Sequence, residues 1–280
     1  MQEKLYKPGL YITATPIGNY KDITLRTLEI FNNCDIIFCE DTRVTNKLLQ
    51  HFDIKKPLYI YNDHSKPHNR KKIIDTILQQ KCVVLVSDAG TPLISDPGYK
   101  LVDECIKNNI KVYPIPGVDS ITTAISVSGL ATNCFTFFGF LPSKTTEKTR
   151  LLENIKNQTQ TSIFFESPHR LLSSLKLIKN ILNDRKVCVA RELTKFYEDI
   201  ETSNASKLIE YYTQKTPKGE IVLIIQGNTK QKTDSIQNLD MDLKELLKKY
   251  KTKEAVNILY EKYNKQINKK TIYNRTLEIS

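Results

Sequence analysis

The sequence predicts an α/β protein made of two α/β domains, the N-terminal one with a parallel sheet and the C-terminal one with a mixed sheet, followed by a small helical tail. Three observations predict this class. The chain has 280 residues, enough for about two domains at roughly 150 residues each. Strand-like and helix-like segments alternate through the first half, and some strand-like runs of the second half lie too close together for helical crossovers. We expect domains at residues 1–117 and 118–230, and the tail at 231–280.

The N-terminal domain is predicted from five short runs rich in β-branched residues. Amphipathic segments with apolar residues three and four positions apart lie between them. Regular alternation of strand and helix is typical of a parallel sheet with right-handed crossovers. We expect strands at 10–15, 35–39, 58–61, 82–87 and 111–115, and helices at 24–32, 42–52, 69–80 and 99–108.

The C-terminal domain is predicted to begin after Pro116 and Gly117, where the pattern changes. About six residues separate the runs at 187–190 and 197–202, which suits a hairpin and not a helical crossover. The sheet should therefore contain antiparallel pairs. We expect strands at 135–140, 162–166, 187–190, 197–202 and 220–226.

The end of the chain is predicted to be a linker followed by three short basic helices. Residues 227–235 are polar and have no periodicity. Residues 240–275 contain ten Lys and Arg against five Asp and Glu. Such helices can bind a nucleic acid, or they can cover the second domain or form a dimer interface. The sequence leaves these alternatives open.

The composition is that of a folded, soluble protein, with 40% hydrophobic and 26% charged residues. No apolar run approaches the roughly 18 residues that cross a bilayer, and residues 1–8 lack the apolar stretch of a signal peptide, so we expect a cytoplasmic protein. The net charge of +11 favours a polyanionic partner, although a lysine-rich composition alone gives the same charge. The six cysteines form no C-x-x-C pair, and we expect buried, reduced thiols.

Two loops are candidates for a binding site because each follows a predicted strand at the edge where open α/β sheets bind ligands. The loop at 13–19 contains Gly18, which allows a close approach to the backbone. The loop at 86–98 holds two Gly, two Pro, two Asp and three hydroxyl residues. Carboxylates there can bind ribose hydroxyls or a cation, and backbone amides can bind an anion. Alternatively, the loop is an elaborate turn whose aspartates cap helices.

Eight ordered blocks resemble the motifs of one family, the ribosomal RNA small-subunit methyltransferases I, which are S-adenosylmethionine enzymes of the tetrapyrrole-methylase-like class. The match runs in order through about residues 10–226 and extends more loosely into the tail. The blocks are TPIGN at 15–19, CEDTR at 39–43, SDAGTP at 87–92 with SDPG at 95–98, PGVDS at 116–120, GFLP at 139–142, FESPHR at 165–170, ARELTK at 190–195 and KGE at 218–220.

The resemblance implies 2′-O-methylation of a cytidine ribose in the decoding region of 16S rRNA, in a homodimer whose donor lies in a cleft between the two domains. The assembled 30S subunit is the implied partner. Relatives vary at Asp119 and Ser120, so which of the two faces the donor stays open, and Val44 is a departure that bears on RNA contact. The implied donor-binding residues are Ser87, Asp88, Ala89, Gly90, Thr91, Ser120, Ile121, Phe165, Ala190, Gly219, Glu220 and Ile221.

The candidate proton acceptors are Glu40, Asp41 and Glu166, with Arg43 and Arg191 as further catalytic candidates. Each of these can instead belong to an ion pair that locks loops together. We expect no metal site, because Pro67 separates His64 from His68 and no third ligand has suitable spacing. Contacts with RNA are expected at Arg43, Lys144, Arg170, Lys195, Lys248 and Lys249.

Two other functions fit the same pattern. A methyltransferase of the same family can act on a small molecule such as a tetrapyrrole precursor, but it has no use for a basic tail. A non-catalytic RNA-binding or assembly factor can retain the pocket without turnover. Donor binding and turnover separate these alternatives from rRNA methylation.

Overall fold

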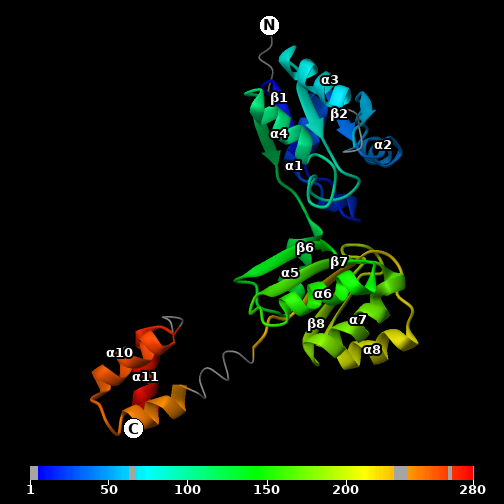
Figure 1. Ribbon diagram of the computed structural model, residues 1–280. Coiled ribbons are helices and arrows are strands. Elements are labelled where there is room, and N and C mark those ends of the chain that lie inside the picture. Colours follow the sequence, from blue (N-terminus) through cyan, green and yellow to red (C-terminus); the bar gives the residue numbers. More distant parts are fainter. Residues whose placement is uncertain (1–5, 63–66, 230–238, 264–266, 280) are drawn as a thin grey trace. The chain divides into compact units, whose positions relative to one another are not determined.

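The computed structural model describes residues 6–62, 67–229, 239–263 and 267–279. The chain forms two compact units. The larger unit consists of residues 1–155 and 160–226, and the smaller one consists of residues 156–159 and 227–280. The larger unit contains both sheets (Figure 1). All described strands of its first sheet precede residue 118, and all those of its second sheet follow it.

The first sheet has five parallel strands in the order β3-β2-β4-β1-β5, as the alternating pattern predicts. The observed ends lie within two residues of the expected ones. Helix α3 starts at Pro67. Proline suits the first turn of a helix because a backbone N–H at that position would have no hydrogen-bond partner within the helix. The elements are β1 (Gly9–Thr13), α1 (Leu25–Asn33), β2 (Ile36–Cys39), α2 (Thr42–His51), β3 (Leu58–Ile60), α3 (Pro67–Leu78), β4 (Cys82–Leu85), α4 (Tyr99–Lys107) and β5 (Val112–Ile115), with a 3-10 turn at Tyr20–Asp22.

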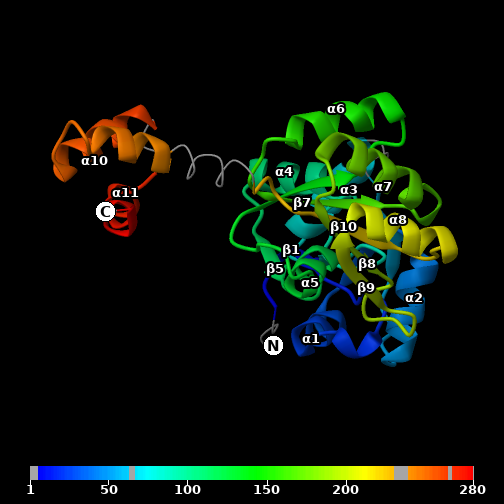
Figure 2. The ribbon, with the colours of Figure 1, turned by 90° about the horizontal axis from the view of Figure 1, so that it is seen from below.

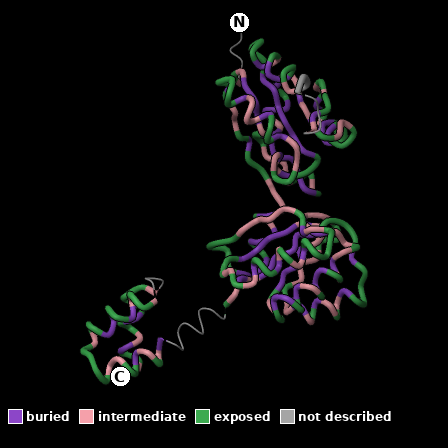
Figure 3. The backbone as a smooth tube through the Cα atoms, viewed as in Figure 1, coloured by how far each residue is buried: buried purple, intermediate pink, exposed green. Residues whose placement is uncertain are grey.

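Alternate side chains of β4 pack on opposite faces of the first sheet. Val84 packs with the buried residues of α1 and α2, and Val83 and Leu85 pack with those of α3 and α4. A strand covered on both faces must be apolar throughout, and all four residues of β4 are buried (Figure 3). Each fully buried Val or Leu contributes about 1.5–3 kcal/mol. This burial fixes β4 in the middle of the sheet and so places the loop that follows it.

The second sheet is mixed, with the order β6-β7-β10-β8-β9. β6 and β7 are parallel, and the other neighbours are antiparallel. The predicted hairpin is confirmed as β8 and β9, although β9 starts at Asp199 because Glu198 N still donates to Lys195 O in the turn. The elements are α5 (Ser120–Val127), β6 (Phe135–Phe140), α6 (Thr145–Ile155), β7 (Thr161–Glu166), α7 (Pro168–Leu182), β8 (Lys186–Arg191), β9 (Asp199–Asn204), α8 (Ala205–Gln214) and β10 (Ile221–Ile225).

Helices cover both faces of the second sheet. Leu152 of α6, Leu171 of α7 and Leu208 of α8 pack on one face, and α5 packs on the other through Ala124 and Ile125. Figure 2 shows α7 and α8 side by side, in agreement with their contacts. Ile17, from the loop after β1, joins the α5 side of this core. The first half of the larger unit therefore packs directly against the second.

Five of the six cysteines are buried free thiols, as expected. Cys134 is the exception and is exposed. The prediction of a buried thiol is wrong there, because Cys134 precedes β6 and does not lie inside it.

The smaller unit has three helices among its described residues, as predicted for the tail: residues 239–246, α10 (Thr252–Lys262) and α11 (Lys269–Ile279). Leu243, Leu259 and Ile272 are fully buried in its core. Arg275 Nη2 lies 2.7 Å from Asp240 Oδ2, which joins α11 to the first of these helices. Part of the predicted linker, residues 230–235, lies outside the described residues.

Candidate active site

A cavity of ≈ 380 Å³ lies inside the larger unit, between loops of its first half and strand ends of its second. This volume is within the usual range for a small-ligand site, about 300–1,000 Å³. The first half contributes the loop after β4 and Ile17 from the loop after β1, and the second contributes the start of α5 and the ends of β6, β7, β8 and β10. The lining residues are Ile17, Asp88, Ala89, Gly90, Thr91, Ile94, Ser95, Asp96, Asp119, Ser120, Ile121, Phe140, Phe165, Glu166, Ser167, Pro168, Ala190, Leu193, Gly219, Glu220, Ile221 and Val222.

The structure brings almost all the predicted donor-binding residues to this cavity. Only Ser87 among the twelve does not line it. Ser87 is buried, and its hydroxyl donates to Ala89 O at 3.2 Å, so it holds the loop in shape. That the eleven others bind a donor stays a prediction.

Several lining residues were not singled out from the sequence. Ser95, Asp96, Phe140 and Leu193 belong to the motif blocks and could have been found from them. Ile94 lies in the candidate loop at 86–98 but outside the motif blocks. Val222 had no such signal, since an apolar residue within a strand is indistinguishable from a core residue.

The two candidate loops of the first half are joined directly. Thr15 N donates to Gly90 O at 2.9 Å, and Gly90 N donates to Thr15 O at 3.0 Å. Gly90 has φ +77°, and Leu93 and Ser95 have φ +75° and +66° although they carry side chains. Left-handed backbone costs about 1–2 kcal/mol for each such residue, and this kind of strain clusters at functional sites. The loop after β4 therefore has a costly conformation that a simple connection would not need.

Carboxylates gather at one side of the cavity. Burial raises the pKa values of both Asp88 and Asp96, although a hydrogen bond to each opposes the shift. Glu40 does not line the cavity, but its pKa is raised by desolvation and by the negative charges of Asp88, Asp96 and Asp41. A cation or a hydroxyl-bearing ligand would relieve this repulsion.

Asp41 and Arg43 form an exposed pair at the start of α2. Asp41 is the N-cap residue, and its Oδ1 accepts from Arg43 N at 2.8 Å. Arg43 Nε also donates to both carboxylate oxygens at 3.1 Å. Hydrogen bonds from the Arg43 side chain and backbone lower the pKa of Asp41 to about 2. The geometry of Asp41 therefore fits the ion-pair alternative, while the side chain of Arg43 is 86% exposed to solvent.

Asp119 and Ser120 both line the cavity. The Asp119 carboxylate caps α5, because its Oδ1 accepts from Ile121 N and Thr122 N, each at 2.9 Å. Its other oxygen accepts from the Thr122 hydroxyl at 2.6 Å. The cap explains why α5 begins here, and of the two residues it makes Ser120 the better candidate for contact with a ligand.

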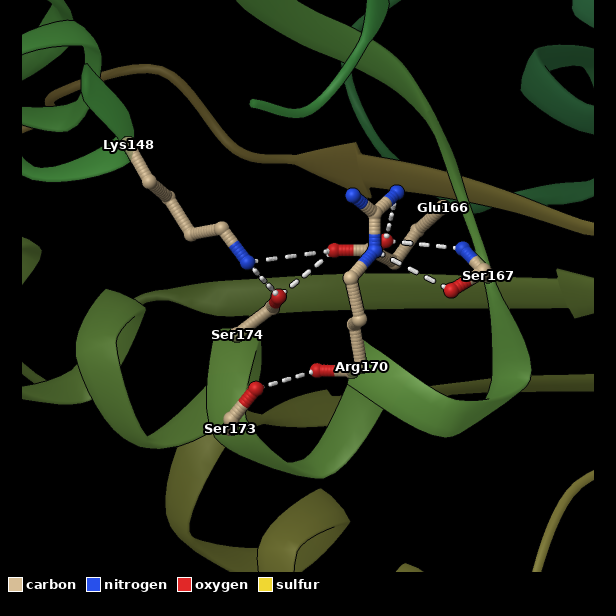
Figure 4. A network of polar contacts seen from close by, with 6 residues as sticks. All are labelled: Lys148, Glu166, Ser167, Arg170, Ser173 and Ser174. Carbon is tan, nitrogen blue, oxygen red and sulfur yellow. Dashed lines mark hydrogen bonds and ion pairs between the residues drawn. The ribbon is translucent and has the colours of Figure 1, made fainter. Parts of the chain in front are cut away.

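Glu166 lies at the end of β7 with its carboxylate fully buried. Its oxygens accept from Ser167 N at 2.7 Å and from the Ser174 hydroxyl at 2.5 Å. Arg170 Nη2 lies 2.9 Å away, and Lys148 Nζ lies 3.6 Å away (Figure 4). Glu166 is thus held by four partners.

The loop after β8 reaches from the second half to the first. Lys195 Nζ lies 2.8 Å from Glu192 and 2.9 Å from Glu220. The Lys195 side chain crosses Gly18 so closely that a Cβ there would lie 2.3 Å from Lys195 Cγ. Glycine at position 18 therefore provides room for this contact. Arg191 Nη2 lies 3.5 Å from Asp199, and its Nη1 donates to Lys218 O at 3.3 Å.

The remaining predicted RNA-contact residues are surface lysines of the two units. Lys144 is exposed and lies 3.3 Å from Glu147. Lys248 and Lys249 belong to the smaller unit, where both are exposed. Their role in RNA binding stays a prediction. Of the two histidines considered as metal ligands, His64 lies outside the described residues.

Solved structures of other proteins share this arrangement of two helix-covered sheets. The chain superimposes on a crystal structure of diphthine synthase with a TM-score of 0.61 and 15% identity, covering 79% of this chain and 90% of that one. A crystal structure of the methyltransferase CobJ gives a TM-score of 0.59 and 14% identity, covering 79% and 94%. Because the sequence identity is so low, these matches establish the fold alone.

Sequence comparison identifies the family. The model of the tetrapyrrole (corrin/porphyrin) methylases matches residues 9–209. The chain is 43% identical to the ribosomal RNA small subunit methyltransferase I of Rickettsia prowazekii over 96% of both chains. It is 42% identical to the protein of that name from Pasteurella multocida, again over 96% of both. The chain therefore belongs to the tetrapyrrole methylase family, in the group of the ribosomal RNA small subunit methyltransferases I, which confirms the resemblance of the eight blocks.

No helix among the described residues is long and apolar enough to cross a membrane.

Proposed function

We propose that this protein transfers a methyl group from S-adenosylmethionine to the 2′-oxygen of a cytidine ribose in the decoding region of 16S rRNA. The observation that carries the proposal is the full-length similarity to proteins named ribosomal RNA small subunit methyltransferase I. Eleven of the twelve residues expected from the motif blocks to bind the donor line one cavity of suitable size.

The residues of the cavity suit S-adenosylmethionine. Apolar side chains such as Ile121, Phe165 and Val222 can pack against an adenine ring. The carboxylates of Asp88 and Asp96 can accept from ribose hydroxyls or face a cationic group. Gly90 lines the cavity in a backbone conformation that disfavours side chains, so no side chain of its own occupies the space for the ligand there. When bound, the donor supplies an activated methyl group on a positively charged sulfur.

The protein's task is then mainly to align the ribose hydroxyl with the donor. Effective molarities of about 10⁵–10⁸ M from positioning exceed the roughly 10²–10⁴-fold that one general base supplies. For the proton of the 2′-hydroxyl, Glu40 is the best acceptor of the three candidates. Its raised pKa makes it a stronger base than Asp41, whose pKa is held near 2. Glu166 is buried and fully engaged by its partners.

The positive net charge of the protein favours a polyanionic substrate. The chain has a net charge of +11, and Arg43 presents its guanidinium to solvent next to Asp41 and near Asp88, which lines the cavity. We include in the proposal that the substrate is the assembled 30S subunit, that the enzyme is a homodimer and that it works in the cytoplasm, where that subunit is found.

The proposal is tested by incubating the purified protein with methyl-labelled donor and small subunits from cells that lack the modification. We expect label in 16S rRNA, recovered as 2′-O-methylcytidine after digestion to nucleosides. Label in a base, or in no RNA fraction, would contradict the proposal.

The two rival functions are separated in the same assay. Replacing Lys248 and Lys249 by alanine should lower turnover on small subunits if the basic tail contacts RNA. A methylase of small tetrapyrroles would instead methylate such precursors and ignore these two changes. Donor binding by calorimetry without turnover on any subunit would favour a non-catalytic assembly factor.

A further inference from the structure

A buried polar network lies behind the wall of the cavity, and two of its members, Lys148 and Ser174, do not line the cavity. We propose that Lys148 and Ser174 are positioning residues that shape the donor site through Glu166, and that Glu166 itself is a positioning residue. This inference rests on the proposed function, since it concerns the site for S-adenosylmethionine. The network is drawn in Figure 4.

The network joins three elements of the second half. Lys148 comes from α6, Glu166 ends β7, and Ser174 lies two turns into α7. Lys148 Nζ donates to Ser174 Oγ at 2.7 Å, and Ser174 Oγ donates to Glu166 Oε2 at 2.5 Å. The lysine residue is only 4% exposed and the serine is fully buried. A lysine is almost never buried to this extent unless it is paired. The ammonium group of Lys148 is paired with the Glu166 carboxylate, 3.6 Å away.

The Glu166 carboxylate accepts two hydrogen bonds and faces two cations. A carboxylate offers about four lone-pair directions. Oε2 faces Ser174 and Lys148, and Oε1 faces Ser167 N at 2.7 Å and Arg170 Nη2 at 2.9 Å. A proton arriving from a substrate would have to displace one of these donors and leave it buried without its partner. That cost favours a fixed anion over a proton acceptor.

The partners of Glu166 fix the segment that forms the cavity wall. Residues 165–168 all line the cavity. Ser167 is held at its backbone by Glu166 and at its hydroxyl by Arg170 Nε, 3.0 Å away. Ser167 is the N-cap residue of α7, and its O accepts from the backbone N–H of Arg170 in the first turn of that helix. Movement of the Glu166 carboxylate would therefore shift both the end of β7 and the start of α7.

The first test replaces Lys148 by methionine, which keeps most of the side-chain volume and removes the cation. We expect the Kd for S-adenosylmethionine, measured by calorimetry, to rise about two- to thirtyfold, the range that corresponds to indirect couplings of about 0.5–2 kcal/mol. Ser174→Ala should act in the same direction. The matched control is Lys56→Met: Lys56 Nζ donates to Cys34 O at 2.8 Å in the first half, and neither residue lines the cavity. That change should lower stability and leave donor affinity unchanged.

A second variant keeps the inference testable if Lys148→Met folds poorly. The double change Lys148→Met with Glu166→Gln removes both charges, so it should lose less free energy of unfolding than the sum of the two single changes. The pH dependence of kcat for Glu166→Gln gives an independent readout. A positioning role predicts that the acidic limb of the profile stays where it is in the wild type.

The outcomes are distinguishable. If the wild-type protein does not bind S-adenosylmethionine, the proposed function fails and the inference fails with it. If the wild type binds the donor but Lys148→Met and Ser174→Ala bind it equally well, only the inference is overturned. If Glu166→Gln binds the donor normally and loses the acidic limb of its pH profile, Glu166 is the proton acceptor and the assignment is wrong.

Discussion

The replacement of Gly219 by alanine tests how the cavity wall is built. Gly219 lines the cavity just before β10 and has φ +84°. A Cβ at this position would lie 2.2 Å from both Cδ and Oε1 of Glu192. The new methyl group must therefore displace the Glu192 carboxylate, which accepts from Glu220 N at 3.0 Å and from Lys195 Nζ at 2.8 Å.

The expected loss of stability has two parts. The left-handed backbone costs about 1–2 kcal/mol with a side chain. The displaced carboxylate loses charge-assisted hydrogen bonds, which adds about 1.5–3 kcal/mol. Gly219→Ala should thus lower the free energy of unfolding by about 2.5–5 kcal/mol. Donor affinity should fall as well, because Glu220 and Ile221 line the same wall.

Gly129 provides the matched control. It has φ +65°, but a Cβ there would meet nothing within 4 Å. Gly129→Ala should therefore show only the backbone part, about 1–2 kcal/mol, with donor affinity unchanged. Urea unfolding followed by circular dichroism gives the stabilities, and calorimetry gives the Kd for the donor. Equal losses of stability in the two variants, or unchanged donor binding in Gly219→Ala, would refute the reasoning.

Four further predictions concern three carboxylates of the first half. Glu40 must be ionised to accept a proton, so kcat/KM should rise with pH through a pKa above the ordinary glutamate value of about 4.3, and Glu40→Gln should remove that limb. Because its raised pKa makes the Glu40 charge a cost to folding at neutral pH, Glu40→Gln should unfold at the same or a higher urea concentration than the wild type; a clear loss of stability would count against this. Asp88→Ala should raise the KM for the donor more than it lowers kcat, and a pure kcat effect would remove Asp88 from the donor site. The pKa of Asp41 is lowered to about 2, so its stabilising contribution is present above about pH 3.9 and is lost as the pH falls towards 2; Asp41→Asn should flatten acid unfolding in that range, and an unchanged acid transition would contradict this.

The sheets could be predicted from the sequence because buried strands need continuous apolar runs. Cys82–Leu85 and Ile221–Ile225 are buried at every position, and the printed sequence shows both as uninterrupted apolar segments. Helix α5 was harder to predict. Its sequence, SITTAISV, is rich in β-branched and hydroxyl residues, which have low helix propensity. It forms because Asp119 caps its N-terminus and its apolar face packs on the second sheet.

The site was predicted mainly through the motif blocks, and its supporting residues were not. Lys148 lies in a segment with Glu147 and Arg150 as neighbours, which reads as the solvent face of a helix. Its burial depends on Glu166 and Ser174, which lie 18 and 26 residues away along the chain. Only the packing of α6 and α7 against β7 brings these three side chains together. No local pattern contains that information.

The most direct test of the account is to map ribose methylation of 16S rRNA in cells that lack this protein. The account predicts that one 2′-O-methylated cytidine in the decoding region is lost, that the wild-type chain restores it, and that Asp88→Ala restores it poorly. An unchanged methylation pattern in the deleted cells would contradict the central claim.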